Sequence, residues 1–116
     1  YSAPASLKNW IDKVFGFNFA YGPEGDKLKG KNLIISTTVG GPEEAYRPLG
    51  YNHFKVTDLL LPFEQTAYLS GLIYREPIFT HGCVYVPGVY NVKEEVEQRA
   101  RNHAARVLAT LEQLAN

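Results

Sequence analysis

Two threonines and two glycines in close succession are the residues of this chain best suited to bind a ligand. Thr37, Thr38, Gly40 and Gly41 follow the apolar run Leu33–Ile35. A short apolar run is typical of a buried parallel strand, and open α/β sheets bind ligands outside the carboxyl ends of such strands. Because glycine lets the backbone come close to a ligand, the segment predicts a loop that approaches a flat ligand.

The remaining reactive side chains offer no second chemistry. His81 lies at the end of an expected strand and His103 on an expected helix. Both are interpreted as structural or exposed, because nothing pairs them as metal ligands, and no metal site is expected. Cys83, the only cysteine, has no CxxC partner and is interpreted as a packing residue of a chain from a reducing compartment. No Ser-His-Asp arrangement, paired carboxylates or Walker loop is visible.

The elements that must position the loop alternate between helices and strands. An amphipathic helix over 4–15 has Pro4 in its first turn and Ser2 as its cap. The last helix begins with a capping box of Asn91 and Glu94. Between them the sequence predicts, in order, a strand over 32–37, a short helical turn over 42–46, a helix over 55–70 that Pro62 starts or kinks and Gly71 closes, and a strand over 77–81.

This alternation predicts an α/β fold with a parallel sheet. The 116 residues fit one small domain. Two parallel strands alone leave both edges of the sheet unpaired and the helices under-covered. We therefore expect the rest of the sheet to come from a segment before Tyr1, so that residues 1–116 form the C-terminal part of a single domain.

Charge and hydropathy exclude several classes of function. Twelve basic residues balance twelve acidic ones, so there is no electrostatic case for binding nucleic acid or an anionic membrane. No apolar run approaches the ~20 residues needed to span a bilayer, and no secretory signal is visible. Together with the single cysteine, these features predict a cytoplasmic protein that does not insert into a membrane.

Several separate segments carry a family resemblance. Residues 1–15, YSAPASLKNWIDKVF, resemble the segment WY-x-x-PA-x-LK-x-W-[IF]-[DE]-[RK]-VF of the flavodoxin-like NAD(P)H:quinone oxidoreductases. That group includes the DT-diaphorases, the modulator-of-drug-activity proteins and the ancillary subunits of glutathione-gated potassium efflux systems. Further matches follow in the family's order: 19–21, 28–31, 37–41, Tyr46, 61–63 and 76–77.

The resemblance implies a flavodoxin-like, doubly wound parallel sheet. It covers nearly the whole chain but only about the last two-thirds of the family's domain, so the N-terminal strands and the phosphate loop are absent from this chain. It implies FAD or FMN as cofactor, NAD(P)H as co-substrate, a quinone-type acceptor, ping-pong hydride transfer and a homodimer. The flavin would carry the chemistry while the protein orients it and tunes its charge.

The resemblance also assigns cofactor contacts. Thr37, Thr38, Gly40 and Gly41 match the loop that wraps the isoalloxazine ring, and Val39 is an insertion relative to the many members that read TTGG. Tyr1 matches the aromatic residue of the preceding flavin loop, although a frayed terminal residue is the alternative.

Tyr46 matches a family tyrosine that manages charge on the flavin and the substrate together with a histidine six residues further on. That place holds Asn52, with His53 beside it. Histidine can donate or accept a proton whereas an amide nitrogen only donates, so the resemblance leaves the proton relay open. His53 is a relay residue or a surface-loop histidine. Tyr21 matches an aromatic residue that, in dimeric members, the partner subunit contributes to the quinone pocket, and the alternative is that it packs in an aromatic loop.

Three functions follow from these residues. The first is NAD(P)H-dependent flavin oxidoreduction of a quinone. The second is a flavin-binding regulatory subunit of a potassium efflux transporter, which the change at Asn52 favours. The third is a truncated fragment without activity, because a flavin bound without its phosphate loop loses most of its binding energy.

Overall fold

The structure, a computed structural model, describes residues 1–116 and divides into two compact units. The first unit contains residues 1–34 and 55–76. The second unit contains residues 35–54 and 77–116. Each unit is built around one pair of parallel strands, so the alternating pattern predicted from the sequence is confirmed as an α/β arrangement.

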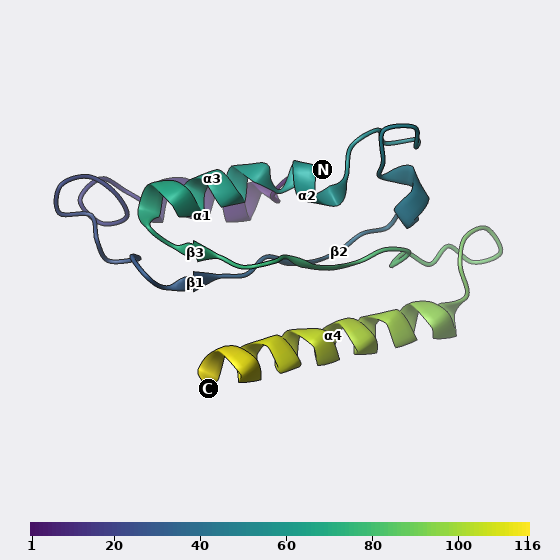
Figure 1. Cartoon of the computed structure of the whole chain (residues 1–116). Coiled ribbons are helices and arrows are strands. Elements are labelled where there is room, and N and C mark those ends of the chain that lie inside the picture. The colour runs from purple at the N-terminus through teal and green to yellow at the C-terminus, as the bar shows by residue number, and fades with distance from the viewer. The chain divides into compact units, whose positions relative to one another are not determined.

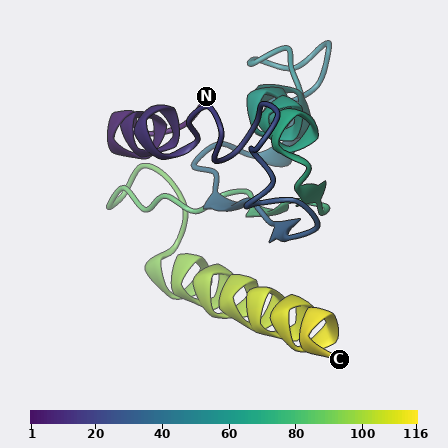
Figure 2. The ribbon, with the colours of Figure 1, turned by 90° about the vertical axis from the view of Figure 1, so that its left-hand side faces the viewer.

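The first unit combines short parallel strands with helices (Figure 1). Its elements are α1 (Ala5–Val14), β1 (Asn32–Leu33), α2 (Val56–Leu59), α3 (Leu61–Ser70) and β3 (Ile73–Tyr74). Strand β1 pairs with β3, and α3 packs against β3. Although α1 and α3 overlap in Figure 1, Figure 2 shows them apart. The small core of this unit consists of Ala20, Val56, Leu60, Phe63 and Ala67.

The predicted helix over 55–70 is two helices, because Leu60, with φ of −96° and ψ of 0°, ends α2 and precedes α3. Pro62 lies in the first turn of α3, where a missing N–H costs no helical hydrogen bond. Gly71 ends α3 in the left-handed conformation, with φ of 73°. The predicted roles of Pro62 and Gly71 are therefore confirmed.

Helix α1 forms as predicted, but its apolar face is not covered within its unit. Leu7, Trp10 and Val14 keep 38, 51 and 38% of their surface exposed. No residue of α1 is buried. The predicted Ser2 cap is wrong, because Pro4 occupies the capping position and no side chain caps the helix.

The second unit places one long helix along a strand pair. Its elements are β2 (Ser36–Thr38), the 3₁₀ turn η1 (Glu43–Ala45), β4 (Ile78–Thr80) and α4 (Lys93–Ala115). Strand β2 pairs with β4, and α4 packs against β4. From α4 the buried His103 contacts Ser36 Oγ through Nε2 and Thr80 Oγ1 through Nδ1, each at 2.9 Å. The interpretation of His103 as structural is confirmed.

The strand predicted over 32–37 is interrupted, whereas the strand predicted over 77–81 forms without a break. The strand predicted over 32–37 is observed as β1 and β2, and the one over 77–81 as β4, with β3 preceding it. Asn32 pairs with Ile73 but Ser36 pairs with Ile78, a shift of one residue in register. Pro77 explains the shift, because it has no N–H to donate and Ile78 N donates to Ile35 O at 2.8 Å instead.

Each ladder contains two strands, so every strand has one edge without a partner strand. The chain lacks a helix that is both long and apolar enough to cross a bilayer.

Candidate functional site

The predicted ligand loop leaves the carboxyl end of β2, beside the end of β4. The strand pairing continues one step past both strands, because Val39 N donates to Thr80 O at 2.8 Å and Cys83 N donates to Val39 O at 2.9 Å. The extra residue Val39 thus extends the ladder. The following glycines begin where the pairing stops.

In the Gly40–Gly41 turn, the carbonyl of Gly41 is hydrogen-bonded, whereas neither N–H group has a backbone acceptor. Gly41 O accepts the N–H of Gly82 at 3.1 Å and lies 3.3 Å from His81 Nδ1. No backbone carbonyl accepts the N–H of Gly40 or of Gly41. A Cβ built at Gly40 would find its nearest neighbour, Val84 Cβ, 3.6 Å away. The turn therefore has a fixed carbonyl, two N–H groups without backbone acceptors, and room for a ligand to approach the backbone at Gly40.

Tyr46 lies directly against this turn. The 3₁₀ turn η1 positions it, since Tyr46 N donates to Glu43 O at 3.0 Å. A Cβ built at Gly41 would lie 3.1 Å from Tyr46 Cε2 and 3.4 Å from its hydroxyl oxygen. Glycine at this position is what lets the tyrosine ring approach the backbone.

His81 joins the same cluster. Its ring centroid lies 5.3 Å from that of Tyr46 and 5.6 Å from that of Phe79, which meets it edge-on. From the sequence, His81 was interpreted as structural or exposed. The available signal was its position just past β4, because the carboxyl ends of parallel strands meet at one edge.

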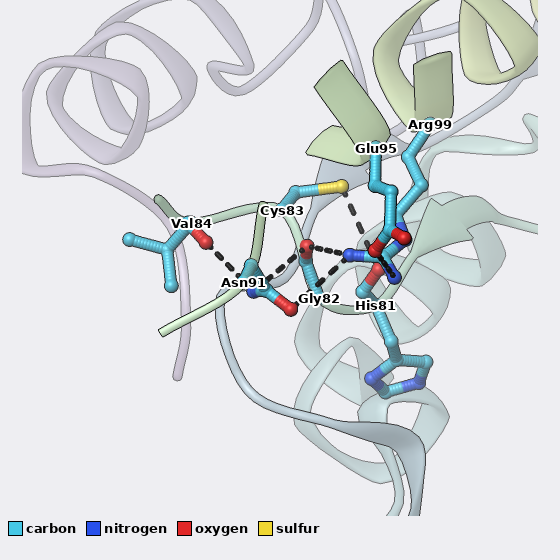
Figure 3. A network of polar contacts seen from close by, with 7 residues as sticks. All are labelled: His81, Gly82, Cys83, Val84, Asn91, Glu95 and Arg99. Atoms are coloured by element: carbon cyan, nitrogen blue, oxygen red, sulfur yellow. Dashed lines mark hydrogen bonds and ion pairs between the residues drawn. The ribbon is translucent and has the colours of Figure 1, made fainter. Parts of the chain in front are cut away.

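A polar network from the start of α4 holds the turn that carries His81 (Figure 3). Arg99 Nη1 donates to Gly82 O at 2.8 Å, and Glu95 lies 3.7 Å from the same guanidinium. Asn91 Nδ2 donates to Val84 O at 2.7 Å and to Gly82 O at 3.3 Å. The predicted capping box is therefore wrong. Val92 occupies the capping position, and the Asn91 amide is used by the turn instead.

Asn52 and His53, which were expected to complete the proton relay, differ in their burial and in their contacts. Asn52 is half-buried, and its N–H donates to Ala45 O at 2.8 Å. His53 is exposed, with φ of 63°. Gly50 lets this loop pass close to η1, because a Cβ there would lie 2.4 Å from Glu44 O. Of the two, Asn52 is the one whose backbone bonds to η1.

The remaining predicted residues divide between the two units. Thr37 is half-buried and Thr38 exposed at the end of β2, and the Thr37 hydroxyl lies 3.3 Å from Thr38 O. Tyr1 and Tyr21 belong to the first unit. Tyr1 is exposed, whereas the ring of the half-buried Tyr21 meets Phe17 at 5.8 Å between centroids.

The pKa values of two other tyrosines, also in the first unit, are displaced. A hydrogen bond to Glu64 raises the pKa of the exposed Tyr68. Partial burial, followed by the charge of Glu64, raises the pKa of Tyr74. Tyr68 also lines a shallow surface depression of about 400 Å³ with Leu61, Pro62, Glu64 and Gln65. None of the residues predicted to bind a ligand lines it.

Comparison with known proteins covers most of the chain. A family described as having a flavodoxin-like fold matches residues 1–109. The uncharacterized NAD(P)H oxidoreductase YdeQ of Bacillus subtilis is 46% identical over 74 residues, which are 64% of this chain and 38% of YdeQ. The potassium-efflux ancillary protein KefG of Salmonella paratyphi B is 38% identical over 104 residues, 90% of this chain and 52% of KefG. The chain thus spans about half the length of these relatives or less.

Solved structures share the arrangement. General stress protein 14 of Treponema denticola, solved with FMN, has a TM-score of 0.77 at 34% identity, covering 92% of this chain and 58% of that one. An NADPH-quinone reductase from P. pentosaceus has a TM-score of 0.72 at 28% identity, covering 89% and 58%. A protein described as a thermophilic tryptophan halogenase from Streptomycin violaceusniger has a TM-score of 0.80 at 34% identity, covering 93% and 60%.

Proposed function

This chain belongs to the flavodoxin-like fold family, and on that premise we propose that it is part of a flavin-dependent NAD(P)H:quinone oxidoreductase. A hydride would pass from NAD(P)H through a bound flavin to a quinone-type acceptor. The observation that carries the proposal is the Gly40–Gly41 turn at the ends of β2 and β4, whose N–H groups have no backbone acceptors. The FMN-bound relative and the NAD(P)H oxidoreductase relative support it.

The residues present fit a flavin ring. The N–H groups of Gly40 and Gly41 would donate to the pyrimidine edge, and Thr37 and Thr38 would contribute hydroxyls. A bound flavin accepts a hydride and passes it on, and N–H donors beside its pyrimidine edge favour the negative charge of the reduced ring. The relative solved with FMN favours FMN over FAD.

Other residues would serve the acceptor. Tyr46, held against Gly41, would manage charge beside the ring, with Asn52 and His53 on the loop that follows. Tyr1 would contact the flavin and Tyr21 the quinone, as the sequence resemblance implies. We also propose a homodimer, which the uncovered apolar face of α1 favours.

Oxidation of NADH and of NADPH by menadione, with the purified chain reconstituted with FMN, tests the proposal. We expect turnover that depends on both the protein and FMN and that exceeds free FMN under the same conditions. Bound FMN without turnover above that background would contradict the enzymatic proposal. A chain that binds no FMN would favour the inactive-fragment alternative.

The second candidate function is a flavin-binding ancillary subunit of a potassium efflux transporter. The match to KefG over 104 residues favours it, as does an apolar surface on the loop after η1. Leu49, Tyr51 and Phe54 are 97, 88 and 61% exposed there, a surface suited to contact with another protein. Brisk flavin-dependent menadione reduction would reject a purely regulatory role.

A further inference from the structure

The hydrogen bond to Gly41 defines which ring nitrogen of His81 carries its hydrogen. Nδ1 of His81 lies 3.3 Å from Gly41 O. A carbonyl oxygen can only accept, so Nδ1 must be protonated when this bond is made. In the neutral imidazole, Nε2 then keeps its lone pair and is the nitrogen that can take up a proton.

Neighbouring groups restrain this ring. Tyr46 lies on one side at 5.3 Å and Phe79 meets it edge-on at 5.6 Å between centroids. The acceptor Gly41 O is itself fixed by the N–H of Gly82 at 3.1 Å. Because both the ring and its acceptor are held, the orientation of the imidazole relative to the glycine turn is fixed.

The charged and titratable groups around His81 do not change the assignment of the ring hydrogen to Nδ1. The Cys83 thiol lies 3.7 Å from the backbone oxygen of His81 and does not contact its ring nitrogens. Arg99 donates to Gly82 O and is paired with Glu95 at 3.7 Å. Tyr46 is the titratable side chain whose ring meets that of His81.

We infer that His81 is the residue of the site that donates a proton to the acceptor. Its imidazole lies beside Tyr46 and can exchange a proton, which the side-chain amide of Asn52 cannot do. This inference rests on the proposed function. NAD(P)H supplies the hydride and electron pair, and the quinone-type acceptor is left with an anionic oxygen. The Nε2–H bond of the imidazolium breaks as an O–H bond forms on that oxygen. Solvent then returns a proton to Nε2, so one hydride and one proton complete the reduction.

The first test uses the free chain and does not depend on flavin. Nitrogen-15 NMR of the imidazole rings, with His81 assigned from the His81→Asn spectrum, reports which nitrogen is protonated. We expect the neutral ring to carry its hydrogen on Nδ1 and Nε2 to gain a proton on acidification. A neutral ring protonated at Nε2, or a ring that does not titrate, would overturn the inference whether or not the chain binds FMN.

The second test compares variants loaded with FMN. In His81→Asn the amide can still donate to Gly41 O but cannot exchange a proton, whereas His81→Phe keeps only an aromatic ring. We expect both to lower kcat for menadione about 100-fold, the range of general acid catalysis, with a smaller change in KM. Wild-type turnover in His81→Asn would mean that His81 only positions the turn.

Absence of bound FMN would count against the proposed function alone, because the NMR test still decides the state of His81.

Discussion

At the scale of single residues, the proposed binding of flavin depends on Gly41. A methyl group there would lie 3.1 Å from Tyr46 Cε2, closer than ordinary van der Waals contact. We expect Gly41→Ala to displace Tyr46 and to weaken FMN binding about tenfold, equivalent to ~1.4 kcal/mol. Quenching of FMN fluorescence measures this. Gly16→Ala is the matched control, because its Cβ would meet no atom within 4 Å. Equal affinity of the two variants would contradict the assignment of the turn.

A second residue-scale prediction concerns Tyr74. Partial burial raises its pKa above the ordinary value of 10.0, so the folded state holds its proton to higher pH than the unfolded state does. This contribution to stability is complete below pH 10.0 and is lost as the pH rises through the folded-state pKa. We expect Tyr74→Phe to lose less thermal stability than wild type between about pH 9 and about pH 11. Parallel losses in the two proteins would refute the role of Tyr74.

The position of some candidate residues is easier to predict from the sequence than that of others, for physical reasons. Thr37, Thr38 and the glycines could be placed at the end of a strand because the strand and the turn are local patterns. The place of His81 beside them could not be predicted, because it comes from a contact with Gly41, which is forty residues away in sequence. Asn91 was predicted to cap a helix, but in the structure its side-chain amide donates to the carbonyls of Gly82 and Val84 instead.

At the scale of elements, Arg99 links α4 to the turn after β4. Its guanidinium donates to the carbonyl of the buried Gly82. Arg99→Ala leaves that carbonyl with one donor fewer, and we expect a loss of about 1 kcal/mol in the free energy of unfolding. Arg101→Ala is the control, because Arg101 is exposed on the same helix and bonds to Gln98. Denaturant unfolding measures both, and an equal loss would contradict the role of Arg99.

The helices followed from the sequence more completely than the strands. Spacing of apolar residues, Pro62 and Gly71 predicted α1, α3 and α4 within a few residues. Strand β3 was missed because Ile73 and Tyr74 form too short a run to carry a pattern. The break between the two strand ladders near Pro77 follows from the missing N–H of that proline. The shift of one residue in register between the ladders also depends on the partner strand, so it cannot be predicted from one segment alone.

At the scale of the whole molecule, much apolar surface remains exposed and the core is small. Trp10 lies on the uncovered face of α1, which favours the proposed homodimer. We expect Trp10→Glu to shift the sedimentation of the chain from dimer to monomer, because it places a charge in an apolar contact. Lys13→Glu, exposed on the same helix, should leave the dimer intact. A wild-type chain that sediments as a monomer at high concentration would exclude the dimer.

The proposed function requires that the glycine turn after β2 binds a flavin ring through its N–H groups. The most direct test is an FMN titration of the nitrogen-15-labelled chain, followed by amide chemical shifts. We predict that the amide signals of Gly40 and Gly41 move in a saturable way and by more than those of exposed glycines such as Gly30 and Gly88. Saturable binding of FMN that leaves the Gly40 and Gly41 signals unmoved would contradict the claim.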